Sequence, residues 1–292
     1  AEHLAEQVTL EAPEYLSAYD FLASVHEAQG NLRLAQQALQ RAADASPLNT
    51  VRQRLVGDTA ARNKDLLAAE KAYGKVIERN RGSSLRSVDD FANLSRVLVE
   101  RGDVAASRKI TADMKREWRG DKQAELASLI TESLCLDAEG SPEKAAQLVG
   151  QALQLQRLAS AEASEKGKHL SHRLAVDLAH ACYATGKSSE AEKIMRQVAA
   201  ENHEDPHLIN HITSVFEKTG QPDAGKALLD QVGKEIIALN NKGVLAARNG
   251  DFEGAVQLLI QAVEQVPNLQ FLINAAKAIA LLALGLGVLV SV

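Results

Sequence analysis

The sequence contains few of the residues that cross-link, kink or stiffen a chain. Its 292 residues include only two cysteines and six prolines, and aromatic residues make up 3% of the total. Two thiols in a chain of this length do not form a disulfide framework. Because Cys135 and Cys182 both fall within helical apolar patterns, we expect them to be buried and reduced. The scarcity of proline favours long helices over a β-rich fold.

The chain also lacks an excess of positive charge and any recognisable catalytic motif. Its net charge is −5 with both signs interspersed, which argues against nucleic acid or an anionic membrane as a partner. It has no glycine-rich phosphate loop, no nucleophile elbow and no zinc-type spacing of Cys and His. We therefore expect no enzyme, no catalytic residue, no cofactor and no metal. No signal-peptide pattern begins the sequence, so a cytoplasmic location is the default, although a processed chain would lack that pattern too.

What the chain does contain is a recurring pair, a turn residue followed five positions later by a small one. The steps between successive turn residues are 34, 38, 38, 46, 34 and 30 residues. A period near 34 is typical of stacked helical hairpins. The seven pairs are Gly30/Ala35, Lys64/Ala69, Gly102/Ser107, Gly140/Ala145, Gly186/Ala191, Gly220/Gly225 and Gly250/Ala255.

Each position of the pattern has a physical role. In the first repeat, over residues 16–49, Gly30 ends one helix in the left-handed conformation and Asn31 is expected to cap the next. Ala35 is small, so the two helices can approach closely, and Pro47 ends the unit. The same cap position holds Asp65, Asp103, Ser141 and Asp251, and Pro142 and Pro222 stand just inside later helix starts.

The repeat pattern resembles that of the tetratricopeptide repeat (TPR) family. The resemblance is carried by a small eighth residue, Gly-Asp or Gly-Asn at the turn, alanine at positions twenty and twenty-seven, and a proline near the end of the repeat. The resemblance implies an all-α fold, a superhelical solenoid of antiparallel helix pairs with about seven repeats and partial repeats at both ends. The alternative is an irregular all-helical bundle. The expected organisation is a truncated repeat over 1–13, seven repeats over 16–268 and a C-terminal helix with an apolar tail over 269–292.

Irregular steps predict where the solenoid departs from regularity. Longer connectors are expected near 80–88, where Ser87 or Asp89 can cap the next helix, and near 155–172, with an extended helix before a connector around Gly167. The short step before Gly250 has no strong helix breaker, so one helix is expected to run into the next. Repeat four is out of phase, because Glu132 falls where a large apolar residue is expected.

Both ends of the sequence look cut. Residues 1–12 have the phase of the second helix of an earlier repeat, which indicates a fragment of a larger protein; a secreted mature chain is the alternative. Residues 278–292 carry no charge and are shorter than the ~20 apolar residues that span a bilayer. Residues 270–284 have the phase of a further first helix. The interpretations of the tail are a terminal packing helix, a self-association surface and a membrane segment.

The TPR resemblance implies a partner-binding concave groove lined by the first helix of each repeat. The basic and Asn quintet with which chaperone-binding members hold a C-terminal carboxylate is not reproduced across consecutive repeats, so a polar, extended or helical peptide is expected instead. The groove positions are Asp20, Ser24, Glu27, Arg54, Asp58, Arg62, Asp89, Asn93, Arg96, Glu100, Arg173, Asp177, His180, Asn210, His211, Asn240, Asn241 and Arg248.

Two polar clusters have alternative interpretations. His203, His207 and His211 are spaced by four and could bind zinc or nickel, act as a pH-sensitive patch, or be ordinary polar residues of the groove. The acidic pair Asp89-Asp90 falls at an expected helix start, where acids favour the helix dipole, and a capping role is preferred over a metal site.

Several stretches, among them YLSAYDFLASVHEAQG and SVDDFANLSRVLVERGD, are similar to bacterial response regulators in which a CheY-like receiver precedes a TPR array. That resemblance implies the effector part of a two-component protein, with the receiver domain upstream of this sequence. The competing hypothesis is an assembly scaffold for envelope, pilus or secretion machinery.

Overall fold

The computed structural model describes residues 2–165, 171–202, 205–248, 251–265, 274–280 and 282. Across these residues every regular element is a helix and no β-strand occurs, which confirms the predicted all-α class. Within the same ranges, no helix combines the length and the apolar character that crossing a bilayer requires.

The helices follow one another with short connections. They are α1 (Glu2–Glu11), α2 (Leu16–Ala28), α3 (Leu32–Ala45), α4 (Thr50–Arg62), α5 (Leu66–Asn80), α6 (Val88–Glu100), α7 (Val104–Glu117), α8 (Lys122–Ala138), α9 (Pro142–Glu165), α10 (His172–Ala184), α11 (Ser188–Asn202), α12 (Pro206–Lys218), α13 (Pro222–Arg248) and α14 (Phe252–Gln265).

The contacts divide the chain into two compact units, Ala1–Leu174 and Ala175–Val292. This division falls just after the connector predicted near 155–172. The helix expected before that connector is extended, since α9 runs for 24 residues. The residues around Gly167 lie outside the described ranges.

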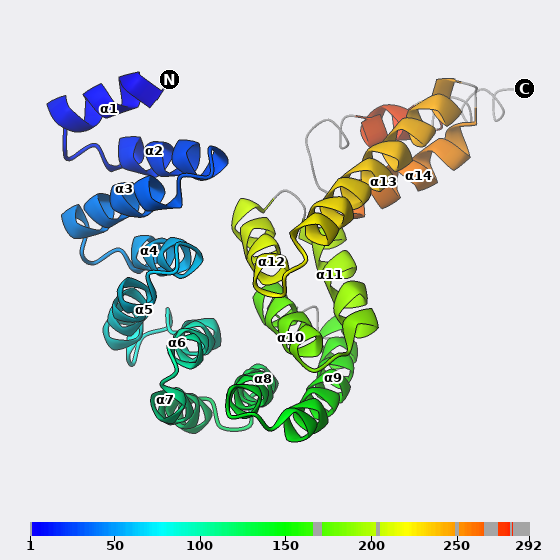
Figure 1. The fold of residues 1–292 in the computed structure, drawn as a ribbon. Coiled ribbons are helices and arrows are strands. Elements are labelled where there is room, and N and C mark those ends of the chain that lie inside the picture. The colour runs from blue at the N-terminus through cyan, green and yellow to red at the C-terminus, as the bar shows by residue number, and fades with distance from the viewer. Residues whose placement is uncertain are drawn as a thin grey trace, which may run out of the picture. The chain divides into compact units, whose positions relative to one another are not determined.

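In the first unit, four antiparallel hairpins follow α1 and form two layers. Figure 1 shows α2, α4, α6 and α8 in one layer, here called the inner face, and α3, α5, α7 and α9 in the other, here called the outer face. Each hairpin joins one helix of each layer, which is the TPR arrangement that the sequence predicts.

The small residue of each repeated pair lies at the contact between the two helices of a hairpin. All seven are buried, and Ala35, Ala69, Ser107, Ala145, Ala191 and Ala255 have no exposed surface. On the other helix of a hairpin, a glycine can provide the same small size at the contact. A Cβ placed on Gly57 of α4 would lie 2.8 Å from the ring of Tyr73 on α5, closer than real Cβ atoms approach. The close packing of the layers therefore depends on these residues being small.

The turns show why glycine recurs in the pattern. Gly30 and Gly102 have φ of 76° and 85°, and Lys64, at the equivalent turn that lacks glycine, has φ of 63°. A left-handed conformation costs about 1–2 kcal/mol for a side chain with a Cβ, so Lys64 is the strained member of this series.

The helix caps are mostly as predicted. Asp65 and Asp103 each accept a hydrogen bond from a backbone N–H of the first turn that follows, and so does Ser87. The expectation for Asn31 was wrong: its side chain makes no capping bond and its amide donates to Gln29 Oε1 at 3.3 Å. Asn31 instead holds the αL glycine turn through its backbone N–H, which donates to His26 O.

The second unit repeats the hairpin with one change. α13 is a single helix of 27 residues, so the predicted continuation of one helix into the next is confirmed. Its last turns pack against α14, where a Cβ on Gly243 would lie 2.6 Å from Leu259. Ala275 and Ala278, in the described segment 274–280, are buried in the same cluster. The remainder of the predicted tail, apart from residue 282, lies outside the described residues.

Burial of the two cysteines is confirmed, and both thiols are free. Burial raises the pKa of Cys135 and raises that of Cys182 to about 12. The out-of-phase Glu132 has its own explanation. Together with Glu139 it accepts hydrogen bonds from Arg108 of α7, at 2.8 and 2.7 Å, so an ion-pair cluster occupies the position where an apolar residue was expected.

We predict that Gly57→Ala destabilises the first unit by about 1–3 kcal/mol, because the added methyl group must displace the buried ring of Tyr73. Urea denaturation followed by circular dichroism measures the change. Gly74→Ala on α5 is the control: a Cβ there meets nothing within 4 Å, so the substitution should be neutral or stabilising. Equal stability of Gly57→Ala and the wild type would contradict the close contact.

Candidate functional site

Charged residues line one face of α4. Arg54, Asp58 and Arg62 are spaced by four and therefore project from the same side of the helix. The helix begins at a defined cap, since Asn49 Oδ1 accepts a hydrogen bond from the N–H of Arg52 at 3.1 Å. This face belongs to the inner layer of the first unit, where the sequence predicts the groove.

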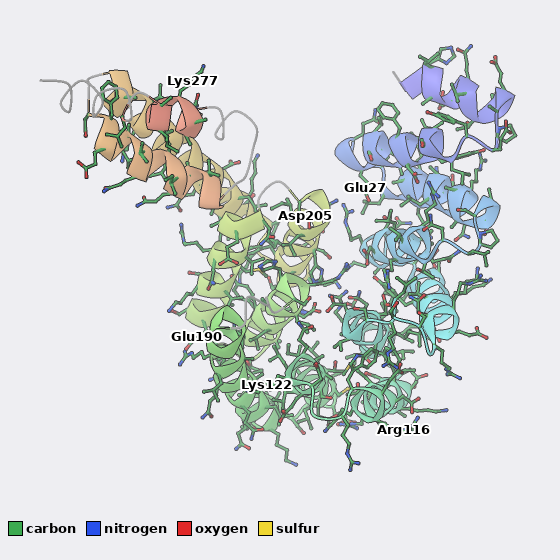
Figure 2. The ribbon with its side chains drawn as sticks, turned by 180° about the vertical axis from the view of Figure 1, so that it is seen from behind. Glu27, Arg116, Lys122, Glu190, Asp205 and Lys277 are labelled. Atoms are coloured by element: carbon green, nitrogen blue, oxygen red, sulfur yellow. The ribbon has the colours of Figure 1, made fainter. Side chains whose placement is uncertain are left out.

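Ion pairs connect α4 to α2. Arg52 donates two hydrogen bonds to Asp20, from Nη2 to Oδ2 at 2.7 Å and from Nε to Oδ1 at 3.2 Å. Near the other end of α2, Glu27 Oε1 accepts from Arg62 Nη1 at 2.9 Å and from Thr59 Oγ1 at 3.0 Å; Glu27 is labelled in Figure 2. Two predicted groove residues, Asp20 and Glu27, are thus held in place by α4.

A third ion pair connects α4 to α6. Arg54 Nε and Nη2 donate to the two oxygens of Asp90 at 2.7 and 2.8 Å, and Nη2 also donates to the carbonyl of Leu85 at 3.1 Å. Asp90 is 2% exposed, and its hydrogen bond with Arg54 raises the pKa of the guanidinium. Asp89 and Asp90 lie in the first turn of α6, as predicted, but neither is the side-chain cap. Ser87 caps α6, and Asp90 is the acceptor of a paired, buried contact.

Asp58 is the acceptor at the centre of this face. Tyr73 Oη donates to Asp58 Oδ1 at 2.5 Å, while Arg173 donates to both carboxylate oxygens at 2.5 and 3.1 Å. Tyr73 is fully buried, and this burial is the main reason that its pKa lies well above 10. Asp58 thus joins α4 and α5 to a residue 115 positions further along the chain.

The segment that carries Arg173 is fixed to the inner face at two further points. Ser171 Oγ donates to Asp89 Oδ2 at 3.0 Å, and Leu174 is buried in a cluster with Phe91 and Ala127. Residues 171–174 belong to the first unit. This chain therefore places a short segment of its own on the predicted groove positions of α4 and α6.

Two other predicted groove residues are buried in α6. Asn93 and Arg96 are 3% and 6% exposed, and Arg96 Nη2 donates to Asn93 Oδ1 at 3.1 Å. Glu100 lies 4.0 Å from the guanidinium, one helical turn away. Asn93 and Arg96 offer little surface to a partner in this structure.

The second unit contains one buried pair of predicted residues. Asp177 on α10 and His211 on α12 are 2.9 Å apart, and both are at least nine-tenths buried. His203 and the side chain of His207 lie outside what the structure describes, so the metal and pH-patch interpretations of the histidine cluster stay predictions. In the part of the chain that is described, no group of three or more His, Cys, Asp or Glu residues is placed to hold a metal ion.

The remaining predicted residues differ in exposure. Ser24 is exposed, whereas His180 and Asn210 are half-buried in the second unit. The side chains of Asn240, Asn241 and Arg248 are not described. The half-buried candidates of the first unit are Asp20, Glu27, Arg54, Asp58, Arg62, Asp89, Glu100 and Arg173.

The sequence interpretation missed four residues that organise this face, namely Arg52, Tyr73, Asp90 and Ser171. Two of them, Arg52 and Asp90, could have been found from the repeat spacing. Arg52 is 32 residues from Asp20 and Asp90 is 36 from Arg54, spacings close to the repeat period that bring side chains of neighbouring first helices together. Ser171 is 82 residues from Asp89, and no repeat spacing predicts that contact.

Comparisons with known proteins give only distant similarities. No family model matches the chain, and no curated protein matches it. Among solved structures, a tetratricopeptide repeat protein from Parabacteroides merdae is 15% identical, with 90% of this chain and 98% of that chain covered and a TM-score of 0.38.

Two further solved structures are similar at the same level. The TPR protein YrrB, described as having an unusual peptide-binding site, is 13% identical over 95% of this chain and all of that chain, with a TM-score of 0.31. A Rap protein in complex with competence and sporulation factor is 15% identical over 91% of this chain and 73% of that chain, with a TM-score of 0.44. These similarities are too distant to indicate a function for this chain.

We predict that Arg173→Ala lowers the unfolding free energy of the first unit by about 1–3 kcal/mol, because Asp58 then loses its charged donor in a partly desolvated site. Hydrogen exchange should also accelerate at the first turn of α10 while α2 and α3 keep their protection. Arg33→Ala, at an exposed position of α3, is the control. Unchanged exchange in the first turn of α10 would show that the contact does not hold this segment.

A second prediction concerns alkaline pH. The pKa of Tyr73 is raised in the folded state, so the folded chain retains a proton that the unfolded chain loses above pH ~10. Wild-type stability should therefore fall by up to about 1.4 kcal/mol per pH unit above that point relative to Tyr73→Phe, which has no proton to retain there. Urea denaturation of both proteins from pH 8 to 11 measures this difference. Parallel stability curves would contradict it.

Proposed function

We propose that this chain is a non-enzymatic interaction module that binds a protein or peptide partner on the inner face of its first unit. The observation that carries the proposal is the set of cross-helix ion pairs on that face. Arg52–Asp20, Arg62–Glu27 and Arg54–Asp90 join three successive first helices. Side chains that are already fixed lose little conformational entropy when a partner binds, so a polar surface of this kind is preorganised for recognition.

The short segment of the chain that lies on the inner face, residues 171–174, restricts where the partner binds. Residues 171–174 contact Asp58 and Asp89, which belong to the α4–α6 part of the face. The α2–α4 part is the one on which we place the partner. Ser24 lies there on the same side of α2 as Asp20 and Glu27, and its side chain is exposed.

The charges of this part favour a polar partner over a strongly charged one. Asp20 and Glu27 each face an arginine, so acid and base are balanced along α2 and α4. A peptide with hydrogen-bonding side chains can use the carboxylate oxygens and guanidinium groups without leaving an unpaired charge buried. Affinity then comes from several modest contacts.

For the biological role, we propose the effector part of a bacterial two-component response regulator, acting in the cytoplasm. The support is the sequence resemblance to receiver–TPR proteins. A receiver domain encoded upstream in the same reading frame would agree with this role. A signal peptide or lipoprotein signal there would favour the alternative, an assembly scaffold for envelope, pilus or secretion machinery.

A bulky substitution at Ser24 tests the binding surface, because it covers the α2–α4 surface and leaves the ion pairs of that surface intact. Peptides selected from a displayed random library on the wild-type chain should bind Ser24→Trp at least about tenfold more weakly, because the indole covers the α2–α4 surface. Fluorescence anisotropy of the labelled peptides gives the dissociation constants.

Ser84→Trp, at an exposed position between α5 and α6, is the matched control and should bind as the wild type does. Charge reversal at Arg54 or Arg96 is unsuitable, since both residues are held in contacts that support the fold. Selected peptides that bind Ser24→Trp and the wild type equally would rule out this surface.

A further inference from the structure

Both units carry grooves that the proposed function does not use. They lie between the second helices of neighbouring hairpins, or between α1 and the second helix that follows it. The groove between α1 and α3 has a volume of about 340 Å³, that between α5 and α7 about 500 Å³, and that between α11 and α13 about 480 Å³. The second of these has a lining that indicates a particular kind of partner.

The α5–α7 groove has the shape of a seat for a helix. Each of the two helices lines it with positions i, i+3, i+4 and i+7, and Leu94 and Leu98 of α6 form its floor. Two helix faces side by side over an apolar floor suit the apolar side of a third, amphipathic helix. The lining positions are Leu67, Glu70, Lys71 and Gly74 on α5, and Ala106, Lys109, Ile110 and Asp113 on α7.

Apolar surface is exposed in this groove. Leu67 is 68% exposed, although it stands on a helix whose opposite side is fully buried. Ile110 and Ala106 are half-buried, packed against the cluster that contains Tyr73 and Leu94. An occupant would therefore extend an existing apolar cluster.

The charged side chains that line the groove leave unpaired positive charge among the described residues, because its acids are already paired with arginines. Glu70 forms an ion pair with Arg101, and Asp113 forms one with Arg116 at 2.6 Å. Within the described residues, the lysines of the lining, Lys71 and Lys109, have no such partner and are exposed.

The basic character continues along α5 beyond the groove. Lys75 and Arg79 follow Lys71 at intervals of four on the same side of the helix, and both are exposed. Glu78 is the exposed acid among them. A net-acidic chain thus presents a locally basic stripe beside an apolar groove, which is complementary to acidic and apolar side chains together.

Gly74 gives an independent indication of close approach. A glycine inside a helix costs roughly 0.5–1 kcal/mol relative to alanine. Gly57 has a contact that requires it, whereas a Cβ on Gly74 would meet nothing within 4 Å. Gly74 lines the groove, so its missing side chain leaves room for the backbone of an occupant rather than for a neighbour in the fold.

We infer that the α5–α7 groove is a second docking surface, and that its occupant is an acidic amphipathic helix of a partner protein. The apolar side of this helix would lie on Leu67, Leu94 and Ile110. Its carboxylates would face Lys71 and Lys109, with Lys75 and Arg79 extending the contact. The surface lies on the opposite layer from the proposed inner site, so both can be occupied at once.

The test uses a defined probe. A fluorescein-labelled peptide of about 18 residues, or five helical turns, carries leucine at i, i+3, i+4 and i+7 positions and glutamate elsewhere. A second peptide has lysine in place of every glutamate. Fluorescence anisotropy with the full chain should show binding of the glutamate peptide, weakened by added salt, and at least about tenfold weaker binding of the lysine peptide.

Substitutions locate the binding. Gly74→Trp fills the groove and Lys71→Glu/Lys109→Glu reverses its charge, and each should weaken binding at least about tenfold. Gly74→Ala adds one methyl group where the occupant's backbone approaches, and should weaken binding less than Gly74→Trp does. Gly150→Trp is the matched control, because Gly150 holds the equivalent position of α9 and a Cβ there also meets nothing within 4 Å. Thermal melts followed by circular dichroism confirm that each variant is folded.

Several results would overturn the inference. They are no binding of the glutamate peptide, equal binding by Gly74→Trp, and equal binding of the lysine peptide. Cosedimentation with phosphatidylglycerol vesicles that depends on Lys71 and Lys109, without peptide binding, would assign the surface to a membrane instead. A sedimenting dimer that Gly74→Trp dissociates would assign it to a second copy of the chain. Loss of binding in Ser24→Trp alone would place the peptide on the inner face.

Discussion

The close approach of two helices within each hairpin is the constraint on which the other features of this protein depend. Small residues such as Ala35 and Ala69 have no exposed surface, and a Cβ on Gly57 would overlap the ring of Tyr73. Because the helices meet this closely, each hairpin forms a thin two-layered unit whose faces are available to neighbours. The inner and outer surfaces exist because the contact between the layers uses little side-chain volume.

Once the hairpins are formed, charges rather than apolar contacts distinguish the inner face. Arg52, Arg54 and Arg62 reach from α4 to carboxylates on the helices on either side. Such partly buried pairs contribute modestly to stability but fix geometry, since a charge removed from water needs its partner in place. The same chemistry lets Arg173 of the chain's own later segment pair with Asp58. The outer groove differs, since Lys71 and Lys109 line it without such partners among the described residues.

Much of the fold was predictable because its determinants are local. The repeated pairs gave the hairpins, the aspartates at positions 65 and 103 gave caps, and the lack of a breaker before Arg248 gave the long α13. The errors concern residues with two available roles. Asn31 makes no side-chain capping bond, and Asp90, although it lies in the first turn of α6 as predicted, is paired with Arg54 of another helix. The site was predicted as a set of positions, and its internal pairing was not.

The sequence by itself determined the helical class, the hairpin period, the turn positions and the residues that had to be small, since each of these follows from contacts within about one repeat. Only the tertiary structure decided which charges are paired, which predicted groove residues are buried, and where the chain divides into units. It also placed Ser171 and Arg173 on α6 and α4, contacts that span 82 and 115 residues. Such contacts depend on the accumulated rotation of several repeats, and no local pattern encodes that rotation.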